Sequence, residues 1–319
     1  MSSRASLIED LRENTQSSKC LESCARLEDV LDRIEQGQTT SAPNPGPRSG
    51  SGSLGSCEFI PAASCSEILR NDPNAESGFY WIDSERPTRQ YCDMTRSCNG
   101  VAGGWMRVAQ LDMRDEGQQC PSGLRQRMDD GMNRTCGIDS NGGVCSTVIF
   151  PVEVRGYSQV CGKINAFQFA SPDGFRSPNR LIDQNYVDGI SLTEGDPMRH
   201  VWTFVAALDE FGSDPSFNCL CTNTNQEDRA GRPPAFVGDD YFCDTGSAEH
   251  WQTIFYGDDP LWDGAGCGPD STCCSLNNPP YFYKDLSYTT STDIEMRVCR
   301  DEGSGNEDIA IRNFEFYVQ

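Results

Sequence analysis

The stretch Tyr91-Cys92-Asp93-Met94-Thr95, followed by Gly103-Gly104-Trp105-Met106-Arg107-Val108, constrains the fold more than any other part of this chain. Gly103 and Gly104 permit a tight approach between backbone segments. Trp105 comes directly after them and supplies a large apolar plate at the start of a strand-like run. We therefore expect a close backbone approach at the two glycines and a buried Trp105 at the start of the strand-like run.

The chain carries 17 cysteines in 319 residues. The cytosol keeps thiols reduced, so a count this high is typical of exported proteins. A zinc site is disfavoured because there are no paired C-x-x-C knuckles and only two histidines, His200 and His250. We predict a disulfide framework in a secreted, extracellular protein.

The beginning of the sequence does not contain an export signal. Met1-Ser2-Ser3-Arg4-Ala5-Ser6 lacks the hydrophobic region of a signal peptide. Because the cysteine chemistry is the harder constraint, we expect a fragment or an incomplete gene model. We also expect no membrane span, since no apolar run reaches the roughly 18 to 20 residues that cross a bilayer.

The formal net charge is −22, from 48 acidic and 26 basic residues. Nucleic acid is excluded as a partner because phosphate binding needs a basic face. The charge suits a soluble secreted protein, or one that collects cations.

An N-terminal segment, 4–36, has the composition of a helix without Pro or Gly. A heptad seam runs along part of it, at Cys20, Cys24, Leu27, Leu31 and Ile34. Cysteines in a seam face their counterparts, so Cys20 and Cys24 predict interchain disulfides in a coiled-coil stalk of a homo-oligomer. The alternative is a single amphipathic helix that folds back on the body.

A Pro/Gly/Ser-rich linker, 37–56, separates the stalk from a body, 57–319. Short strand-like runs separated by turn residues occur in the body at 79–82, 105–109, 146–150, 201–205, 295–298 and 314–318. One helix is expected near 65–70. The pattern predicts an α+β fold that is β-rich and stapled by disulfides, with fourteen cysteines between Cys65 and Cys299 available for internal bridges.

Four motifs in order resemble the opening of a fibrinogen-related domain: Cys65-Ser66-Glu67-Ile68-Leu69, Ser77-Gly78-Phe79-Tyr80-Trp81-Ile82-Asp83, Tyr91-Cys92-Asp93-Met94-Thr95 and Gly103-Gly104-Trp105. That opening occurs in fibrinogen chains, ficolins, tenascins and intelectins (X-type lectins). The resemblance implies a fibrinogen-like head with a Cys65–Cys92 disulfide, and it implies calcium. The rest of the body departs from fibrinogen and ficolins, since their Asp-x-Asp calcium loop and Cys-Ala-x-x-Asn segment are missing. Segments 233–240 and 307–317 are faintly similar to intelectins.

Calcium is the better chemical hypothesis for a site, because no catalytic motif is present and we expect no enzyme. Calcium takes six to eight oxygen ligands. Two short, Gly-flanked segments offer three carboxylates each, and the candidate ligands are Asp239, Asp240, Asp244, Asp258, Asp259 and Asp263. The alternative is that these are ordinary acidic surface turns.

Sugar binding needs aromatic plates and polar groups. The candidate ligand-binding residues are His250, Trp251, Tyr256, Trp262, Tyr281 and Tyr283. Ordinary core packing is the alternative for each of them. Asn133-Arg134-Thr135 is an acceptable N-glycosylation sequon.

These features together predict a secreted lectin-like recognition or adhesion protein. Its partners would be glycans or extracellular glycoproteins, and its heads would be multivalent and use calcium. The alternative is an extracellular-matrix or structural glycoprotein that binds protein partners or mineral.

Overall fold

A computed structural model describes residues 54–56, 60–83, 85–128, 134–138, 144–168, 180–187, 189–208, 233–246, 281–300 and 309–319. The predicted stalk helix, the seam cysteines Cys20 and Cys24, and Asn133 of the predicted sequon lie outside these residues. Residues 54–56, which close the predicted linker, contact the body. Gly55 accepts a hydrogen bond from the amide of Trp81 at 2.8 Å and donates to the carbonyl of Ile60 at 2.7 Å.

The described part of the chain is rich in β-strands and has one short helix, α3 (Cys65–Asn71). The strands that begin the body are β1 (Gly78–Ile82), β2 (Thr88–Asp93), β3 (Ser97–Cys98), β4 (Val101–Ala102), β5 (Trp105–Asp112), β6 (Arg125–Met128) and β7 (Arg134–Gly137). They are followed by β8 (Val144–Phe150), β9 (Tyr157–Gln168), β10 (Gly189–Glu194), β11 (Arg199–Leu208), β12 (Tyr241–Gly246), β13 (Phe282–Thr290), β14 (Ile294–Arg300) and β15 (Ile309–Val318). All six predicted strand runs and the predicted helix are confirmed.

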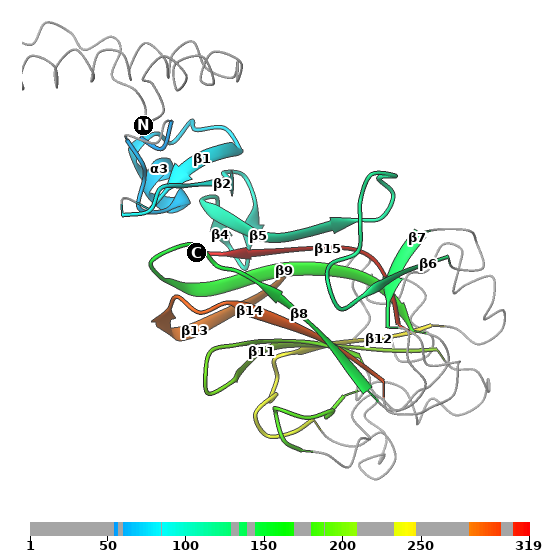
Figure 1. Ribbon diagram of the computed structural model, residues 1–319. Coiled ribbons are helices and arrows are strands. Elements are labelled where there is room, and N and C mark those ends of the chain that lie inside the picture. The colour runs from blue at the N-terminus through cyan, green and yellow to red at the C-terminus, as the bar shows by residue number, and fades with distance from the viewer. Residues whose placement is uncertain are drawn as a thin grey trace, which may run out of the picture.

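The strands form two main sheets and a small β3–β4 hairpin (Figure 1). In the eight-stranded sheet, the C-terminal strand β15 is central: it pairs with β9 along one edge and with β5 and β7 along the other. Beyond β5 come β2 and then β1, and β13 lies beyond β9. The five-stranded sheet has the order β12-β11-β10-β14-β8, and its β11–β12 pair is parallel. Strand β15 therefore lies in the interior of this sheet, with partners on both of its edges.

Aromatic side chains fill the space between the two sheets. Phe282 of β13 stacks on Trp202 of β11 with ring centres 5.2 Å apart. Phe150 of β8 meets Phe314 and Phe316 of β15 at 5.5 and 5.8 Å. These contacts bury the inner faces of both sheets and give the fold its core.

The predicted close backbone approach is confirmed, beside α3 and residue Gln319. Gly103 and Gly104 both have positive φ, and a Cβ at Gly104 would lie 2.8 Å from the Cα of Ser66. Gln319 donates a side-chain hydrogen bond to the carbonyl of Gly103 at 2.8 Å. Trp105, next in the chain, is fully buried.

Disulfides join segments that are distant in sequence. The bridges among the described residues are Cys65–Cys92, Cys98–Cys161, Cys120–Cys136 and Cys145–Cys299. The first links α3 to β2 and is the pair that the resemblance implies. No helix within the described ranges is long and apolar enough to cross a membrane.

Candidate ligand-binding face

Strand β13 divides its side chains between two faces of the eight-stranded sheet. Tyr281, just before the strand, and Tyr283 face away from the second sheet, whereas Phe282 packs between the sheets. Tyr283 lies edge-on to Trp105, with ring centres 6.4 Å apart. Two of the predicted ligand-binding residues thus lie together on the outer face of this sheet.

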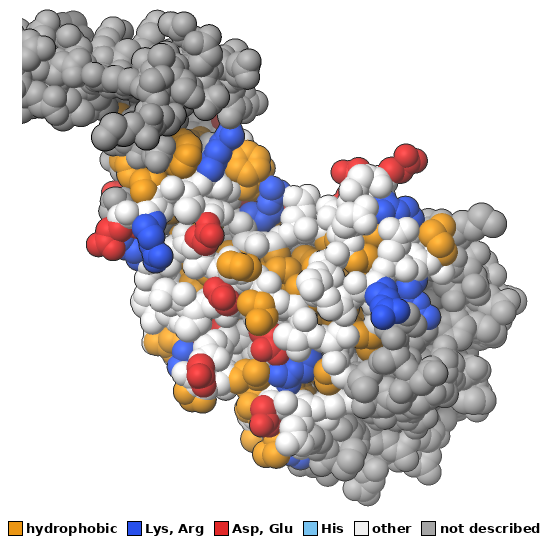
Figure 2. Space-filling model, viewed as in Figure 1, with side chains coloured by type: hydrophobic (Ala, Val, Ile, Leu, Met, Phe, Trp, Pro, Cys, Tyr) orange, Lys and Arg blue, Asp and Glu red, His pale blue; other side chains and the backbone are white. Residues whose placement is uncertain are grey.

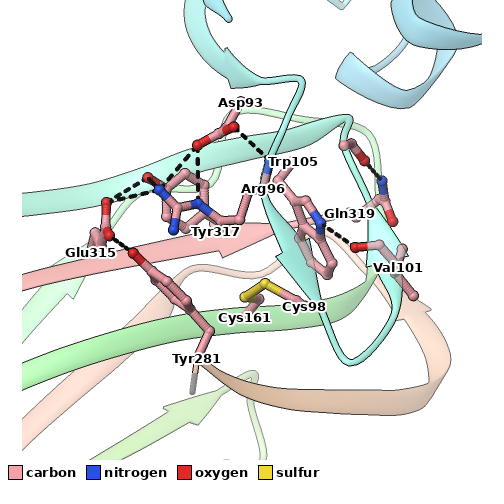
Figure 3. Close-up of a disulfide and its surroundings, with 11 residues drawn as sticks. Asp93, Arg96, Cys98, Val101, Trp105, Cys161, Tyr281, Glu315, Tyr317 and Gln319 are labelled. Atoms are coloured by element: carbon pink, nitrogen blue, oxygen red, sulfur yellow. Dashed lines mark hydrogen bonds and ion pairs between the residues drawn. A yellow bond between two sulfur atoms is a disulfide. The ribbon is translucent and has the colours of Figure 1, made fainter. Parts of the chain in front are cut away.

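Arg96 lies between the rings of Tyr281 and Tyr317 (Figure 3). The carbon at the centre of its guanidinium is 4.3 Å from the centre of the first ring and 4.2 Å from the second. The same guanidinium donates to Asp93 through Nε at 3.1 Å and to the hydroxyl of Tyr317 at 2.9 Å. It also forms an ion pair with Glu315 at 3.3 Å.

Glu315 accepts hydrogen bonds from both tyrosine hydroxyls, one on each carboxylate oxygen. Burial and then the hydrogen bond to Glu315 raise the pKa of Tyr281 to about 12. The pKa of Tyr317 is raised for the same two reasons. Both phenols therefore stay protonated at neutral pH and act as hydrogen-bond donors.

Asp93, Arg96, Tyr281, Glu315 and Tyr317 form one cluster. Its hydrogen-bond donors and acceptors are paired with one another. It is built on the predicted strand that ends the chain and on the turn after β2, and it packs beside the Cys98–Cys161 disulfide (Figure 3). Such a network fixes the position and orientation of Tyr281. It gives no free acid or base for catalysis.

The first of the two acidic segments carries Asp239, Asp240 and Asp244, and it contacts β13 from the face opposite Tyr283. We call the part with Asp239 and Asp240 the acidic turn. The carboxylate of Asp240 pairs with the ammonium of Lys284, the residue after Tyr283. The backbone carbonyl of Asp240 accepts from the amide of Thr203 at 3.1 Å. Asp239 is exposed, and Asp244 lies on β12. The acidic turn and Tyr283 therefore meet at one strand but on opposite faces.

Aromatic packing holds this acidic turn against the five-stranded sheet. Phe236 lies edge-on to Tyr186, with ring centres 4.9 Å apart, and 6.0 Å from the ring of His200. His200 bonds to the hydroxyl of Thr203 through Nε2 at 2.7 Å. Burial, with a smaller effect of Lys284, lowers the pKa of His200 to about 3, so the imidazole is neutral.

The described residues do not by themselves form a calcium site. No group of three or more His, Cys, Asp or Glu side chains within the described ranges could hold a metal ion. Asp240 is already neutralised by Lys284, and two carboxylates fall short of the six to eight oxygens that calcium takes. The remaining candidates Asp258, Asp259, Asp263, His250, Trp251, Tyr256 and Trp262, and the side chain of Asp244, lie outside what the structure describes.

Sequence reasoning missed Arg96, Glu315, Tyr317 and Lys284. One signal was present for Arg96, which directly follows the motif that ends at Thr95. No comparable signal marks Lys284, because its partner Asp240 lies 44 residues earlier. No protein-family model matches this sequence, and a search of curated proteins finds no significant match.

Proposed function

We propose that this protein is a secreted, lectin-like recognition or adhesion protein that binds glycans through fibrinogen-related heads, with calcium as its cofactor. The heads would be joined through the stalk at 4–36 by Cys20 and Cys24, so that weak single sites act together. The body is a binding module in this proposal rather than an enzyme.

The observation that carries the proposal is the meeting of the acidic turn and the aromatic strand at β13. Asp240 is held by Lys284, and the neighbouring residue Tyr283 faces outward together with Tyr281. Aromatic rings suit the apolar face of a sugar, and carboxylates suit its hydroxyls or a metal. The two kinds of group lie on opposite faces of one strand, so a ligand that uses both would reach around β13. The four disulfides in the described ranges support a location outside the cytosol.

The test is a glycan array probed with the oxidised, full-length oligomer, once in calcium and once in EDTA. We expect calcium-dependent binding to a narrow class of sugars. The double variant Asp239→Asn/Asp240→Asn should weaken it at least tenfold. A matched control, Glu116→Gln/Asp183→Asn, removes the same charge at exposed positions and should bind normally.

Absence of glycan binding in both conditions would overturn the proposal and favour the matrix alternative. Calcium titration separates these two functions further. A lectin site binds one or two ions per chain tightly, whereas a matrix protein with diffuse negative charge binds many ions weakly and in a salt-sensitive manner.

A further inference from the structure

A row of two aromatic side chains, each with an arginine over its ring, crosses the outer face of the eight-stranded sheet at its β1 edge. Phe79 on β1 lies opposite Tyr91 on β2, and their rings meet edge-on at 5.4 Å. The guanidinium of Arg89 lies 5.3 Å from the centre of the Phe79 ring, and that of Arg107 on β5 lies 4.0 Å from the centre of the Tyr91 ring. We call these four side chains the cation–aromatic row.

The row is open to solvent. The side chain of Phe79 is among the most exposed large apolar groups of the described residues, at 56%. Arg89 is exposed, and Tyr91 and Arg107 are half-exposed. Over β1 and β2, basic side chains stand beside hydrophobic ones in Figure 2. An exposed aromatic ring with a guanidinium over it is an unusual surface for a protein whose acidic residues outnumber its basic ones by 48 to 26.

The two arginines of the row are not neutralised. Within the described ranges, neither Arg89 nor Arg107 has an ion pair or a side-chain hydrogen bond. Other arginines of the same structure are held by carboxylates: Arg96, Arg114, Arg155, Arg199 and Arg297. The rings beneath Arg89 and Arg107 orient the guanidiniums without using their N–H groups. Both guanidiniums can therefore donate hydrogen bonds to an anion.

The row matches an acidic sugar in shape and charge. An exposed aromatic face accepts the apolar face of a pyranose, and a guanidinium binds a carboxylate through two parallel hydrogen bonds. Arg89 and Arg107 stand on the paired strands β2 and β5, on the same side of the sheet as the two rings. The net charge of −22 repels a dense polyanion, so a chain with one carboxylate per disaccharide suits the row better than a nucleic acid.

We propose that the cation–aromatic row binds a carboxylate-bearing sugar of an acidic glycan, without calcium. The sugar ring would stack on Phe79, and its carboxylate would be bound by Arg89 and Arg107. This inference rests on the lectin-like function proposed above, but it assigns a second subsite on different residues, at the opposite end of the sheet from β13.

The test measures binding of the full-length oligomer to two hexasaccharides by calorimetry in EDTA. One alternates glucuronate with N-acetylglucosamine, and the other contains N-acetylglucosamine alone. We expect at least tenfold tighter binding of the acidic chain, and a loss of this preference in 0.5 M salt. Arg89→Gln/Arg107→Gln should weaken binding of the acidic chain at least tenfold, and Phe79→Ser about three- to tenfold.

The double variant Arg70→Gln/Arg86→Gln is the matched control. It removes two exposed arginines outside the row and should bind the acidic hexasaccharide like the unmodified protein. Equal binding by the control and by Arg89→Gln/Arg107→Gln would overturn the inference. So would binding of a poly-glutamate peptide as tightly as the acidic sugar, because the row would then recognise charge alone.

The two proposals fail separately. Calcium-dependent binding on the array, with no binding of the glucuronate chain in EDTA, would overturn the second subsite and leave the proposed function standing. Binding of the glucuronate chain in EDTA, with no calcium-dependent binding of any glycan on the array, would overturn the proposed calcium-dependent site at β13 and leave the second subsite standing. Thermal unfolding of each variant shows that it is folded before binding is interpreted.

Discussion

The carboxylate of Asp93 accepts hydrogen bonds from both the backbone amide and the guanidinium of Arg96, at 2.9 and 3.1 Å. The amide and hydroxyl of Thr95 bond to it as well, each at 3.1 Å. Burial alone would raise the pKa of Asp93, but these hydrogen bonds hold it below its usual value. The hydrogen bonds of Asp93 therefore fix the orientation of the Arg96 side chain. Arg96 in turn fixes the position of the Tyr281 ring that it contacts.

Arg96→Lys should destabilise the body by about 2 to 3 kcal/mol in urea unfolding. A lysine keeps the charge but cannot stack flat between Tyr281 and Tyr317 while it donates to Asp93. Arg70→Lys at the exposed end of α3 should change the free energy of unfolding by less than about 0.5 kcal/mol. A cost for Arg96→Lys as small as for this control would mean that the stacked geometry contributes little.

Gly103→Ala should cost more stability than Gly100→Ala, although both glycines have positive φ. At Gly103 a Cβ would lie 2.4 Å from the carbonyl oxygen of Met94, whereas at Gly100 it would meet nothing within 4 Å. The backbone strain, about 1 to 2 kcal/mol, is common to both variants. We expect Gly103→Ala to lose at least about 2 kcal/mol beyond that, measured as the difference between the two variants in urea unfolding. Equal losses would show that the turn can move to accommodate the methyl group.

Acid should destabilise the protein through Glu194. This carboxylate is buried, and its burial would raise the pKa, but hydrogen bonds from Arg199, Thr292, Tyr288 and Thr290 keep the pKa below the usual 4.5. The stabilisation is thus fully present above pH 4.5 and is lost as the pH falls through the lower, folded-state value. The melting temperature should fall in this range, and Glu194→Gln should lower the free energy of unfolding by about 2 to 4 kcal/mol at pH 7.

Glu116→Gln, at an exposed position, is the control for Glu194→Gln. It should leave both the stability at pH 7 and its loss in acid unchanged. If Glu194→Gln unfolds in acid with the same pH dependence as the unmodified protein, other carboxylates such as Asp93 carry the acid sensitivity.

Local pattern was enough to predict six of the strands of the body but not their pairing. The run 314–318 was found from its aromatic and apolar residues, and the run 105–109 from Trp105 and its neighbours. Nothing local indicates that these two runs pair, because the partners Tyr317 and Arg107 lie more than two hundred residues apart. Strand β9 was not predicted, because its outward positions carry polar side chains, including Gln159 and Lys163, that interrupt the apolar run.

The residues of the candidate site were likewise predicted only in part. Tyr281 and Tyr283 were identified from their aromatic character, and the structure places both on one outer face. Arg96 was missed because a lone arginine in a turn resembles a solvated surface residue. Its role depends on Glu315 and Tyr317, which only the insertion of β15 beside β5 brings into reach.

Replacing both cysteines of the Cys98–Cys161 bridge with alanine should destabilise the body by up to about 4 kcal/mol, from the loop of 63 residues that it closes. The bridge ties the β3–β4 hairpin to β9 beside Trp105 and Tyr283. Hydrogen exchange should therefore increase first in the hairpin and in the turn that carries Arg96. Uniform acceleration across both sheets would indicate that the bridge stabilises the fold only globally.

Lys284→Met should increase the affinity of the head for calcium. The ammonium of Lys284 occupies the cation position beside Asp240, so a metal ion must compete with it for that carboxylate. With methionine in its place, Asp240 keeps its charge and loses its counter-charge, which favours an added cation. We expect calcium to bind at least threefold more tightly in calorimetry.

Lys163→Met, which removes one lysine from the neighbouring strand β9, controls for net charge. An equal gain in both variants would place the calcium away from Asp240, and no gain in either would mean that this carboxylate is not a ligand.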